Sequence, residues 1–597
     1  MLGSSLVEPA RSRFEGSDYQ LSMIHGSWIL KVPENPRAPL SFVAPCHMFD
    51  TSRKAVEFVQ RMDRILLVRP IFVIILLPSL FVMSFGCGSN KIVFPPAPKH
   101  AVAEQVVSEA RQFEIGSDTL TADFGTITVP ENRAKTGSRL LSIPFLRIRS
   151  SARTPEEPIF GLAGGPGASN ISRDWNKAST FLPEHDFVLV GYRGVDGSTI
   201  LDCPEVAEAI KGDGDLFGEE SMMRIGRSWN ASAQRLTARG IDLDRYTMLE
   251  TIDDNESVRK ALGYERINLL SESYGTRVAY LYGLRYPERI HRSAMIAVNP
   301  PGHFVWDSRM IDTQLRQYAT LWSGDSAMSL KSPDLYASMR TVLNTMPRRW
   351  LFFPIDPGKV KVTTFTLLFH RNTAAMVFDA YVAAERGDPS GLALMSLAYN
   401  YVVPSMGTWG DFASKATSAD FDSARDFRRD IEPSGMPLGS PMNVLAWGPT
   451  AYGRWPTQRL SEEYRQLRRS DVETLLLSGN LDFSTPAEFA TRELLPCLTR
   501  GRQIILSDCG HVGDVWNVNA ANTRLMLTSF YKTGVPDVSL NSHVPMDFRV
   551  SWGFPRIAKA AVGGTVLIVF ALAALILRFV LKHRKLAAQR ALGSTCT

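Results

Sequence analysis

Three side chains that lie far apart in the sequence have types and a chain order that suit nucleophilic chemistry. Ser273, Asp482 and His511 each follow a short apolar run that is typical of a buried strand. A serine hydroxyl is a poor nucleophile until an imidazole takes its proton, and a carboxylate keeps that imidazole in the required tautomer. The order serine, acid, histidine is that of triads built at the carboxyl ends of parallel strands. We therefore predict Ser273 as nucleophile, His511 as general base and Asp482 as the residue that orients it.

Each of these residues also has an ordinary structural interpretation. Ser273 could cap a helix, Asp482 could serve a turn before a proline, and His511 could be a loop histidine beside a glycine. Their joint occurrence, each after an apolar run and in this order, favours the triad. Small residues, Ser271 and Gly275, also stand two before and two after the serine, where a sharp strand-to-helix turn leaves little room.

A glycine-rich loop offers backbone donors for the negative charge that an attack on a carbonyl creates. Residues 158–163 predict a strand that runs into Gly-Gly-Pro-Gly at 164–167. Glycines at such a place let backbone N–H groups approach a substrate oxygen closely. We predict an oxyanion hole formed by the N–H of Gly165 and that of Tyr274, the residue after the nucleophile. A plain Gly-Pro turn is the alternative.

At these motifs the sequence resembles the α/β-hydrolases of the proline iminopeptidase and tripeptidyl aminopeptidase type. Five ordered motifs between about Phe124 and Trp516 carry the resemblance: Gly-Gly-Pro-Gly at 164–167, Arg-Gly-Val-Asp-Gly-Ser at 193–198, Ser-Tyr-Gly-Thr at 273–276, Gly-Asn-Leu-Asp-Phe-Ser-Thr-Pro at 479–486 and Gly-His at 510–511. The resemblance implies an α/β-hydrolase fold, with a mostly parallel central sheet flanked by helices. It also implies exopeptidase activity on peptide amino termini, as in some members, or hydrolysis of small esters and amides, as in others.

The sequence departs from this family beside two of the motifs. Ala163 stands where the family often has histidine, and Gly191 stands where it often has aspartate. Neither position belongs to the predicted triad. Arg193, after the next predicted strand, could be a surface arginine in a tight turn or a residue with a role toward substrate.

Composition excludes several classes of protein. The 597 residues, 45% of them hydrophobic, are enough for a large core and a second subdomain. The net charge of +6 comes with no basic stripe interleaved with aromatics, so we expect no nucleic-acid partner. Cysteine and histidine show no metal-ligand spacing, so no metal is expected. A triad needs no cofactor for acyl transfer, and none is expected.

The chain is predicted to contain a hydrolase core in two parts, 100–300 and 471–535, separated by a helical cap over 301–470. Strands at 124–129 and 140–148 should pair antiparallel at an edge of the sheet. Further strands are expected near Ile159, Val188, Leu269, Met295, Leu476 and Ile505. The cap is expected after the sixth parallel strand.

A helix is predicted to begin after residues 251–254, where acidic side chains favour the positive amino end of a helix. Periodicity in this segment predicts the helices of the cap. The resemblance to the α/β-hydrolases implies that such a cap shapes the substrate pocket and excludes water from the chemistry. An aminopeptidase would need carboxylates in that cap to hold the substrate ammonium group. The candidates are Asp307, Asp312, Asp379 and Glu385, each of which could instead be a solvated surface charge.

The amino-terminal region has the features of an export or anchoring segment. Residues 1–61 are an extension that need not belong to the mature protein, and residues 62–87 place arginines before an apolar run that ends in Gly-Cys. The segment could be a cleaved signal, an uncleaved anchor, or a signal for lipid attachment at Cys87.

The carboxyl-terminal region predicts a transmembrane helix at 557–581, long enough to cross a bilayer about 30 Å thick. A buried core helix is the alternative. The positively charged tail at 582–597 should lie in the cytoplasm, which places the hydrolase domain outside, in the periplasm or extracellular space.

Cys497 and Cys509 flank the last predicted strand, and they could form a disulfide or remain two buried thiols. Taken together, the sequence favours a membrane-anchored serine hydrolase that acts on small peptides at their amino termini. An esterase or amidase is the first alternative. A catalytically silent hydrolase fold that serves as a binding module is the second.

Overall fold

The computed structural model describes residues 20–24, 27–31, 44–45 and 92–593, except 116–117, 173–174, 213 and 434. The chain forms two compact units, one of residues Gly88–Val562 and one of Met1–Cys87 with Gly563–Thr597. The predicted segment at 62–87, with its lipid-attachment candidate Cys87, lies outside the described residues. Of the expected extension, only three short strands are described, β1 (Gln20–Ile24), β2 (Ser27–Lys31) and β3 (Ala44–Pro45).

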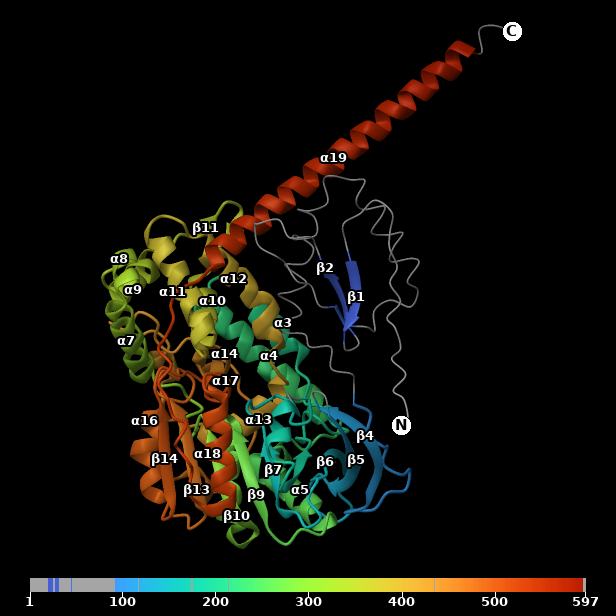
Figure 1. Cartoon of the computed structure of the whole chain (residues 1–597), viewed down its shortest axis with the longest axis vertical. Helices are drawn as coiled ribbons and strands as arrows, with labels where there is room; N and C mark the ends of the chain where they lie inside the picture. The colour runs from blue at the N-terminus through green and yellow to red at the C-terminus, as the bar shows by residue number, and fades with distance from the viewer. Residues whose placement is uncertain are drawn as a thin grey trace, which may run out of the picture. The chain divides into compact units, whose positions relative to one another are not determined.

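A nine-stranded sheet forms the centre of the larger unit (Figure 1). Its order is β14-β13-β10-β9-β7-β8-β6-β5-β4. The strands are β4 (Val106–Ile115), β5 (Asp118–Pro130), β6 (Leu140–Ile148), β7 (Glu156–Leu162), β8 (His185–Val190), β9 (Ile267–Glu272), β10 (Ile290–Ile296), β13 (Glu473–Gly479) and β14 (Gly501–Leu506). Within this sheet, β8, β7, β9, β10, β13 and β14 pair in parallel in succession, whereas β4, β5, β6 and β8 pair antiparallel in succession. The predicted mostly parallel sheet of an α/β-hydrolase is confirmed.

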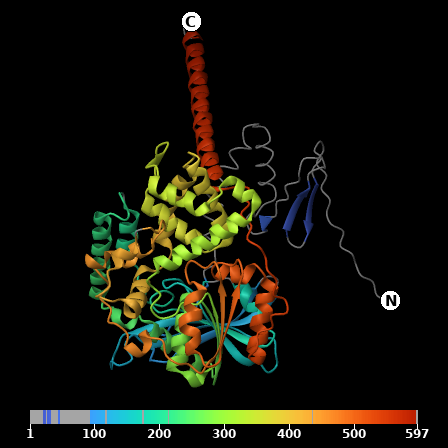
Figure 2. The ribbon, with the colours of Figure 1, turned by 90° about the vertical axis from the view of Figure 1, so that its left-hand side faces the viewer.

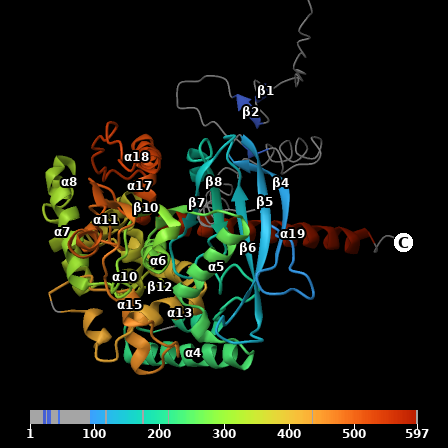
Figure 3. The same ribbon diagram turned by 90° about the horizontal axis from the view of Figure 1, so that it is seen from below.

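The antiparallel edge is wider than predicted (Figure 3). Strands β5 and β6 contain the expected segments, but β4 was not predicted. Most side chains of β4 are exposed or half-buried, since the strand lies at the edge of the sheet. Its sequence therefore lacks the apolar run by which the inner strands were recognised.

Helices cover both faces of the parallel strands. Side chains of α5 (Met248–Ala261) and α6 (Tyr274–Arg285) pack in one core cluster with Leu269 of β9. Side chains of α17 (Val512–Asn517) and α18 (Ala520–Thr533) pack in another with the next residue, Leu270. Because successive side chains of a strand point to opposite faces, a strand covered on both sides must be apolar throughout.

Helix α5 begins earlier than predicted. It starts at Met248, where the side chain of Thr247 caps it by accepting a hydrogen bond from the N–H of Leu249 at 3.3 Å. The acids that suggested a later start lie inside the helix. Asp253 pairs with Arg285 and Asp254 pairs with Arg193, so their charges serve ion pairs instead of the helix end.

A layer of helices lies over the carboxyl ends of the parallel strands (Figure 2). The segment between β10 and β13 contains α7 (Ser308–Gly324), α8 (Ser326–Lys331), α9 (Leu335–Thr345), α10 (Pro357–Leu367), α11 (Arg371–Glu385), α12 (Ser390–Val402), α13 (Trp409–Asp420), α14 (Asn443–Ala446) and α15 (Glu462–Arg465). Strand β10 is the fourth parallel strand along the chain, so the expected position after the sixth is wrong. Six strands were predicted before the cap, but the first two of them correspond to β5 and β6, which pair antiparallel.

The cap has a second part that the predicted boundaries assigned to the core. Helices α3 (Pro204–Lys211) and α4 (Glu219–Ala238) come between β8 and α5. The indole N–H of Trp229 on α4 donates to the carbonyl of Leu445 on α14 at 3.2 Å. Its ring also meets that of Trp409 on α13 edge-on, with centroids 6.3 Å apart. Two separate insertions therefore build the cap.

Helix α19 (Phe554–Gly593) ends the described chain. Among the described residues, its segment Phe554–Leu586 is the one long and apolar enough to cross a membrane, and 6% of its most apolar window is buried. This segment contains the predicted span at 557–581, and the low burial argues against a core helix. The helix continues into the expected tail, whose last residues, 594–597, are not described.

The disulfide between Cys497 and Cys509 is absent, because both residues are free thiols. The two cysteines lie at opposite ends of β14, a strand of six residues. At about 3.3 Å per residue such a strand spans roughly 20 Å, whereas a disulfide needs α-carbons within about 7 Å. Because the two cysteines lie beyond opposite ends of the same strand, they are too far apart to form a disulfide.

Candidate active site

A strained turn places Ser273 between β9 and α6. Its backbone has φ 52° and ψ −122°, a region that residues other than glycine rarely adopt and that costs on the order of 1–3 kcal/mol. The N–H of Ser273 donates to the carbonyl of Ile296 on β10 at 2.9 Å, which helps to hold the turn. The side chain therefore stands at the carboxyl end of β9, an inner strand of the sheet, at the start of a helix.

The small residues around Ser273 allow this turn to pack against β7. A Cβ on Gly275 would lie 2.2 Å from the carbonyl oxygen of Leu162, so only glycine fits there. Ser271 is fully buried, and its hydroxyl donates to the carbonyl of Ala294 at 3.1 Å. Serine therefore fills the first small position of the turn with its polar group satisfied.

The three residues predicted to act together lie within hydrogen-bonding distance of one another. His511 Nε2 lies 2.9 Å from Ser273 Oγ, and His511 Nδ1 lies 2.8 Å from Asp482 Oδ2. Asp482 is fully buried and follows β13, whereas His511 follows β14. An imidazole held between a hydroxyl and a carboxylate in this way can accept a proton at Nε2 while the charge that develops is stabilised at Nδ1.

Thr485 holds the carboxylate of Asp482, a role that the sequence analysis did not assign. Its hydroxyl donates to Asp482 Oδ2 at 2.8 Å and its backbone N–H donates to Oδ1 at 3.0 Å. The N–H of Ser484 also donates to Oδ1, at 2.8 Å. The spacing Asp-x-x-Thr is the signal for such local capping, since short side chains bond backbone groups two or three residues away.

The glycine-rich loop after β7 lies directly against Ser273. A Cβ on Gly164 would stand 3.1 Å from the Cβ of Ser273, so the loop backbone reaches the nucleophile candidate. Gly165 has φ 133°, a conformation closed to other residues. Tyr274 is the first residue of α6, so its N–H has no carbonyl partner within the helix. The loop that carries Gly165 therefore lies against the serine, and Tyr274 directly follows it in the chain.

Helix α13 of the cap holds this loop in place at Gly167. The N–H of Thr408 donates to the carbonyl of Gly167 at 2.8 Å, and the N–H of Gly167 donates to Asp411 Oδ2 at 3.0 Å. Asp411 forms an ion pair with Lys415, and both side chains are fully buried. Burial raises the pKa of Asp411, and Lys415 opposes that rise. The sequence analysis missed this pair because an Asp–Lys spacing of four is usual on exposed helix surfaces.

A second contact ties the cap to the loop that carries His511. The N–H of His511 donates to the carbonyl of Phe369, between α10 and α11, at 2.7 Å. Asp514 accepts from the N–H of Gly510 and from that of Arg371, each at 2.9 Å. The cap therefore contributes to the position of two loops of the site, and not only to the wall of a pocket.

Comparison with protein families agrees with this architecture. The family described as alpha/beta hydrolase fold matches residues 157–339, which include the glycine-rich loop and the turn at Ser273. The chain has the α/β-hydrolase fold. Asp482 and His511 lie beyond the matched residues, and their assignment to the site comes from the hydrogen bonds described above.

The chain is also similar to two curated proteins, the tripeptidyl aminopeptidases of Streptomyces lividans and Streptomyces coelicolor. Each is 26% identical over 203 residues, which make up 32% of this chain and 37% of the relative. The similarity therefore spans little more than a third of the relatives' length.

Solved structures of α/β-hydrolases resemble this chain only loosely. An alpha/beta hydrolase from a Medee basin deep-sea metagenome library has a TM-score of 0.33 at 11% identity and covers 67% of this chain and 97% of its own. The esterase EaEST from Exiguobacterium antarcticum has a TM-score of 0.31 at 12% identity and covers 66% and 96%. At these scores the likeness adds nothing to the fold described above.

The four candidate carboxylates of the cap occupy different environments. Asp312 pairs with Arg316 at 2.8 Å, and Glu385 accepts from the hydroxyl of Ser338 at 2.6 Å. Asp379 lies against the backbone of Gly553, just before α19, where a Cβ would be 2.1 Å from its oxygen. All three are thus engaged in contacts within the cap or at the start of α19.

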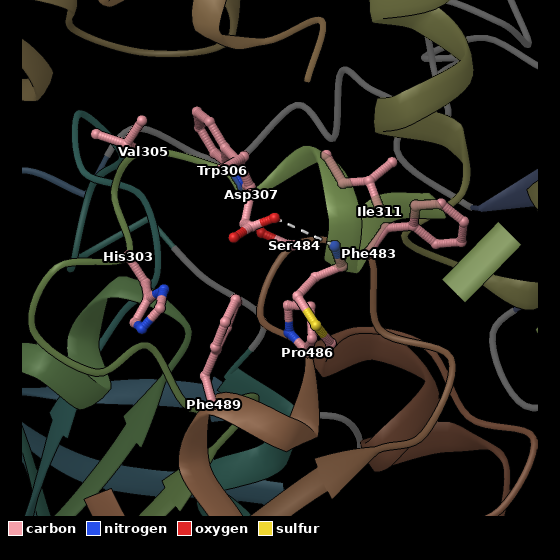
Figure 4. A pocket seen from close by; sticks show the side chains of 10 residues that line it. His303, Val305, Trp306, Asp307, Ile311, Phe483, Ser484, Pro486 and Phe489 are labelled. Atoms are coloured by element: carbon pink, nitrogen blue, oxygen red, sulfur yellow. Dashed lines mark hydrogen bonds between the residues drawn. The ribbon is translucent and has the colours of Figure 1, made fainter. Parts of the chain in front are cut away.

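Of the four, Asp307 lines the small pocket shown in Figure 4. The pocket is partly open and is walled mainly by apolar side chains, among them Trp306, Phe483 and Phe489. It adjoins the site because Phe483 and Ser484 directly follow Asp482. Burial raises the pKa of Asp307, but hydrogen bonds from Arg309 outweigh burial and leave the pKa below its usual value. The carboxylate is therefore ionised at neutral pH.

Arg193 does not lie at the surface. It is fully buried, and its guanidinium forms two hydrogen bonds with Asp254, at 2.6 and 2.5 Å. It also donates to the backbone carbonyls of Glu131 and Arg245, at 3.1 and 2.8 Å. The ion pair therefore joins the turn after β8 to α5, and the surface interpretation is wrong.

We expect Arg193→Met to lower the free energy of unfolding by about 3–5 kcal/mol, because Asp254 would stay buried without its main partner. The measurement is a urea titration of the purified chain followed by tryptophan fluorescence. Arg153→Met, at an exposed arginine, is the control and should change stability by less than about 0.5 kcal/mol. Equal losses of stability from the two substitutions would show that the buried ion pair contributes no more to folding than an exposed arginine.

Proposed function

We propose that this protein is a serine hydrolase that releases residues from the amino termini of small peptides. The observation that carries the proposal is the continuous hydrogen-bonded series from Ser273 Oγ through His511 to Asp482, with contacts of 2.9 and 2.8 Å. The series lies at the carboxyl ends of three strands of the sheet, beside a loop with backbone donors. A silent binding module would have no need for the imidazole or the acid.

In the proposed reaction, Ser273 attacks the substrate carbonyl as His511 Nε2 takes its proton. The charge on the carbonyl oxygen is stabilised by the N–H groups of Gly165 and Tyr274. His511 then gives the proton to the leaving amine, and an acyl group remains on Ser273. Water activated by His511 cleaves that ester, while Asp482 stabilises the imidazolium in both halves.

Two features support peptides with a free amino terminus as substrates. One is the similarity to tripeptidyl aminopeptidases, although it covers only part of their length. The other is Asp307, an ionised carboxylate in an apolar pocket beside the acid loop. We assign Asp307 to the substrate ammonium group, for which Arg309, 3.3 Å away and mostly exposed, would give way. Small esters or amides are the second class, since the same attack cleaves them.

The catalytic domain is proposed to lie outside the cytoplasm, held to the membrane by α19. The apolar segment of this helix is followed by Lys582, Arg584 and Lys585. Positive charge next to a membrane span favours the cytoplasmic side, which would leave the residues before the span on the other side.

A fluorophosphonate probe and three substrate types test these assignments. We expect the probe to label the purified chain at Ser273, and peptide amides with a free amino terminus to be cleaved faster than the same peptides with a blocked one. Asp307→Asn should raise KM for free peptides and leave ester hydrolysis unchanged. Turnover of esters alone would favour the esterase, and absence of both labelling and turnover would favour the binding module.

A further inference from the structure

An apolar hairpin protrudes from the cap between α9 and α10. Its strands are β11 (Arg349–Trp350) and β12 (Phe353–Pro354), and its tip is formed by Leu351 and Phe352. These two side chains are 57% and 76% exposed. The rings of Trp350 and Phe353 stack behind them with centroids 5.9 Å apart. Adjacent exposed apolar side chains on a rigid turn mark an interaction surface.

The base of this hairpin lies close to the start of α19. The N–H of Asp356, just after β12, donates to the hydroxyl of Ser396 on α12 at 3.0 Å. On the same helix, the hydroxyl of Ser390 donates to the carbonyl of Pro555 in the first turn of α19 at 3.4 Å. Six residues of α-helix separate the two serines, a rise of about 9 Å. In Figure 1, β11 and the first turn of α19 lie at the same end of the cap.

No linker separates the cap from the apolar span. Lys559 pairs with Asp388 at 2.7 Å, so the second turn of α19 is still attached to the cap. Ala558 is 4% exposed, whereas apolar side chains from Val566 onward are mostly exposed. Only a few residues of chain therefore separate the part of α19 that is packed on the cap from the exposed apolar side chains that would enter a bilayer.

The charges around the hairpin favour a lipid surface. Arg348 and Arg349 are exposed, and neither forms an ion pair with any residue that the structure describes. Before the span, the guanidinium of Arg556 lies 4.4 Å above the ring of Trp552, which is 43% exposed. Aromatic side chains beside arginines are typical of the membrane–water interface, where the rings lie among headgroups and the cations meet anionic phosphate.

We propose that the hairpin tip, Leu351 and Phe352, inserts into the interface of the bilayer that α19 crosses, with Arg348 and Arg349 on anionic headgroups. The proposal rests on α19 as a membrane span and is independent of the catalytic assignment. Two attachments, the helix and the hairpin, would then fix the cap against the membrane. A tip of two side chains is too small for a stable protein interface, which buries about 800 Å² on each partner.

Fluorescence quenching in vesicles tests the insertion. The full chain with Phe352→Cys carries a nitrobenzoxadiazole label and is reconstituted in phosphatidylglycerol–phosphatidylcholine vesicles that contain doxyl-labelled lipid. The matched control is Val535→Cys, 49% exposed and next to Gly534, which lies beside Glu473 at the amino end of β13, the edge opposite the cap. The unsubstituted chain, treated alike, gives the background from native cysteines.

We expect the label at position 352 to be quenched roughly threefold more than the label at 535, with a blue-shifted emission. Adding Arg348→Glu and Arg349→Glu should remove the dependence of this quenching on phosphatidylglycerol. Equal quenching at both positions would overturn the proposal, as would failure of the full chain to float with vesicles. A detergent-solubilised dimer that Phe352→Asp converts to monomer would also overturn it, because a second copy would then cover the tip.

Discussion

Ser273→Ala should lower the turnover number by about a millionfold, the size of loss seen where a triad acts as one unit. The substitution removes the nucleophile, so no acyl group can form and His511 is left without a proton to take. The variant still binds substrate and keeps the backbone donors near the carbonyl. Its residual rate should therefore be about a thousandfold above that of the uncatalysed reaction in water. The measurement is kcat with the best peptide or ester found, together with fluorophosphonate labelling, which should disappear.

Ser478→Ala is the matched control for this substitution. Ser478 lies fully buried on β13, and its hydroxyl has no hydrogen-bond partner among the described residues. Removal of an unpaired buried hydroxyl should leave both stability and turnover near those of the unsubstituted chain. If Ser273→Ala retained more than a few per cent of the activity while remaining folded, another residue would have to be the nucleophile.

Asp482→Asn should lower kcat by about ten thousandfold with the fold intact. The backbone N–H groups of Ser484 and Thr485 can still donate to the amide oxygen, so the loop keeps its contacts. The amide nitrogen would then face His511 Nδ1 as a donor, which favours the tautomer with its proton on Nε2, the wrong form for a general base. The effect is measured as the change in kcat and as the change in the rate of fluorophosphonate labelling.

The control for this change is Asp471→Asn, at the opposite end of the same strand. Asp471 precedes β13, and its side chain is 80% exposed, whereas Asp482 follows β13 and is fully buried. Asp471→Asn should change turnover by less than twofold, roughly the effect of losing an exposed charge. A loss of only tenfold in Asp482→Asn would mean that Asp482 merely positions the loop and another group orients His511.

The cap shows why part of the molecule escaped prediction. Its main segment was recognised by helical periodicity, but α3 and α4 were assigned to the core because periodicity does not say which layer a helix joins. The pair Asp411 and Lys415 has the spacing of a surface ion pair, and its burial follows only from the packing of α13 on the loop at Gly167. Arg193 was misplaced for the same reason, since Asp254 is 61 residues away along the chain.

The sequence by itself determined the strand-to-helix turn at Ser273, the order of the candidate site residues and the apolar span at the carboxyl end. The turn and the span each depend on residues within a few positions of one another, so their types and spacing carry the information, and the order of the site residues can be read directly along the chain. Only the tertiary structure decided that His511 meets both Ser273 and Asp482, that two cap helices hold the loops of the site, and that Cys497 and Cys509 stay apart. These contacts join segments up to 238 residues apart, and such distances are set by the packing of whole layers, which local sequence does not encode.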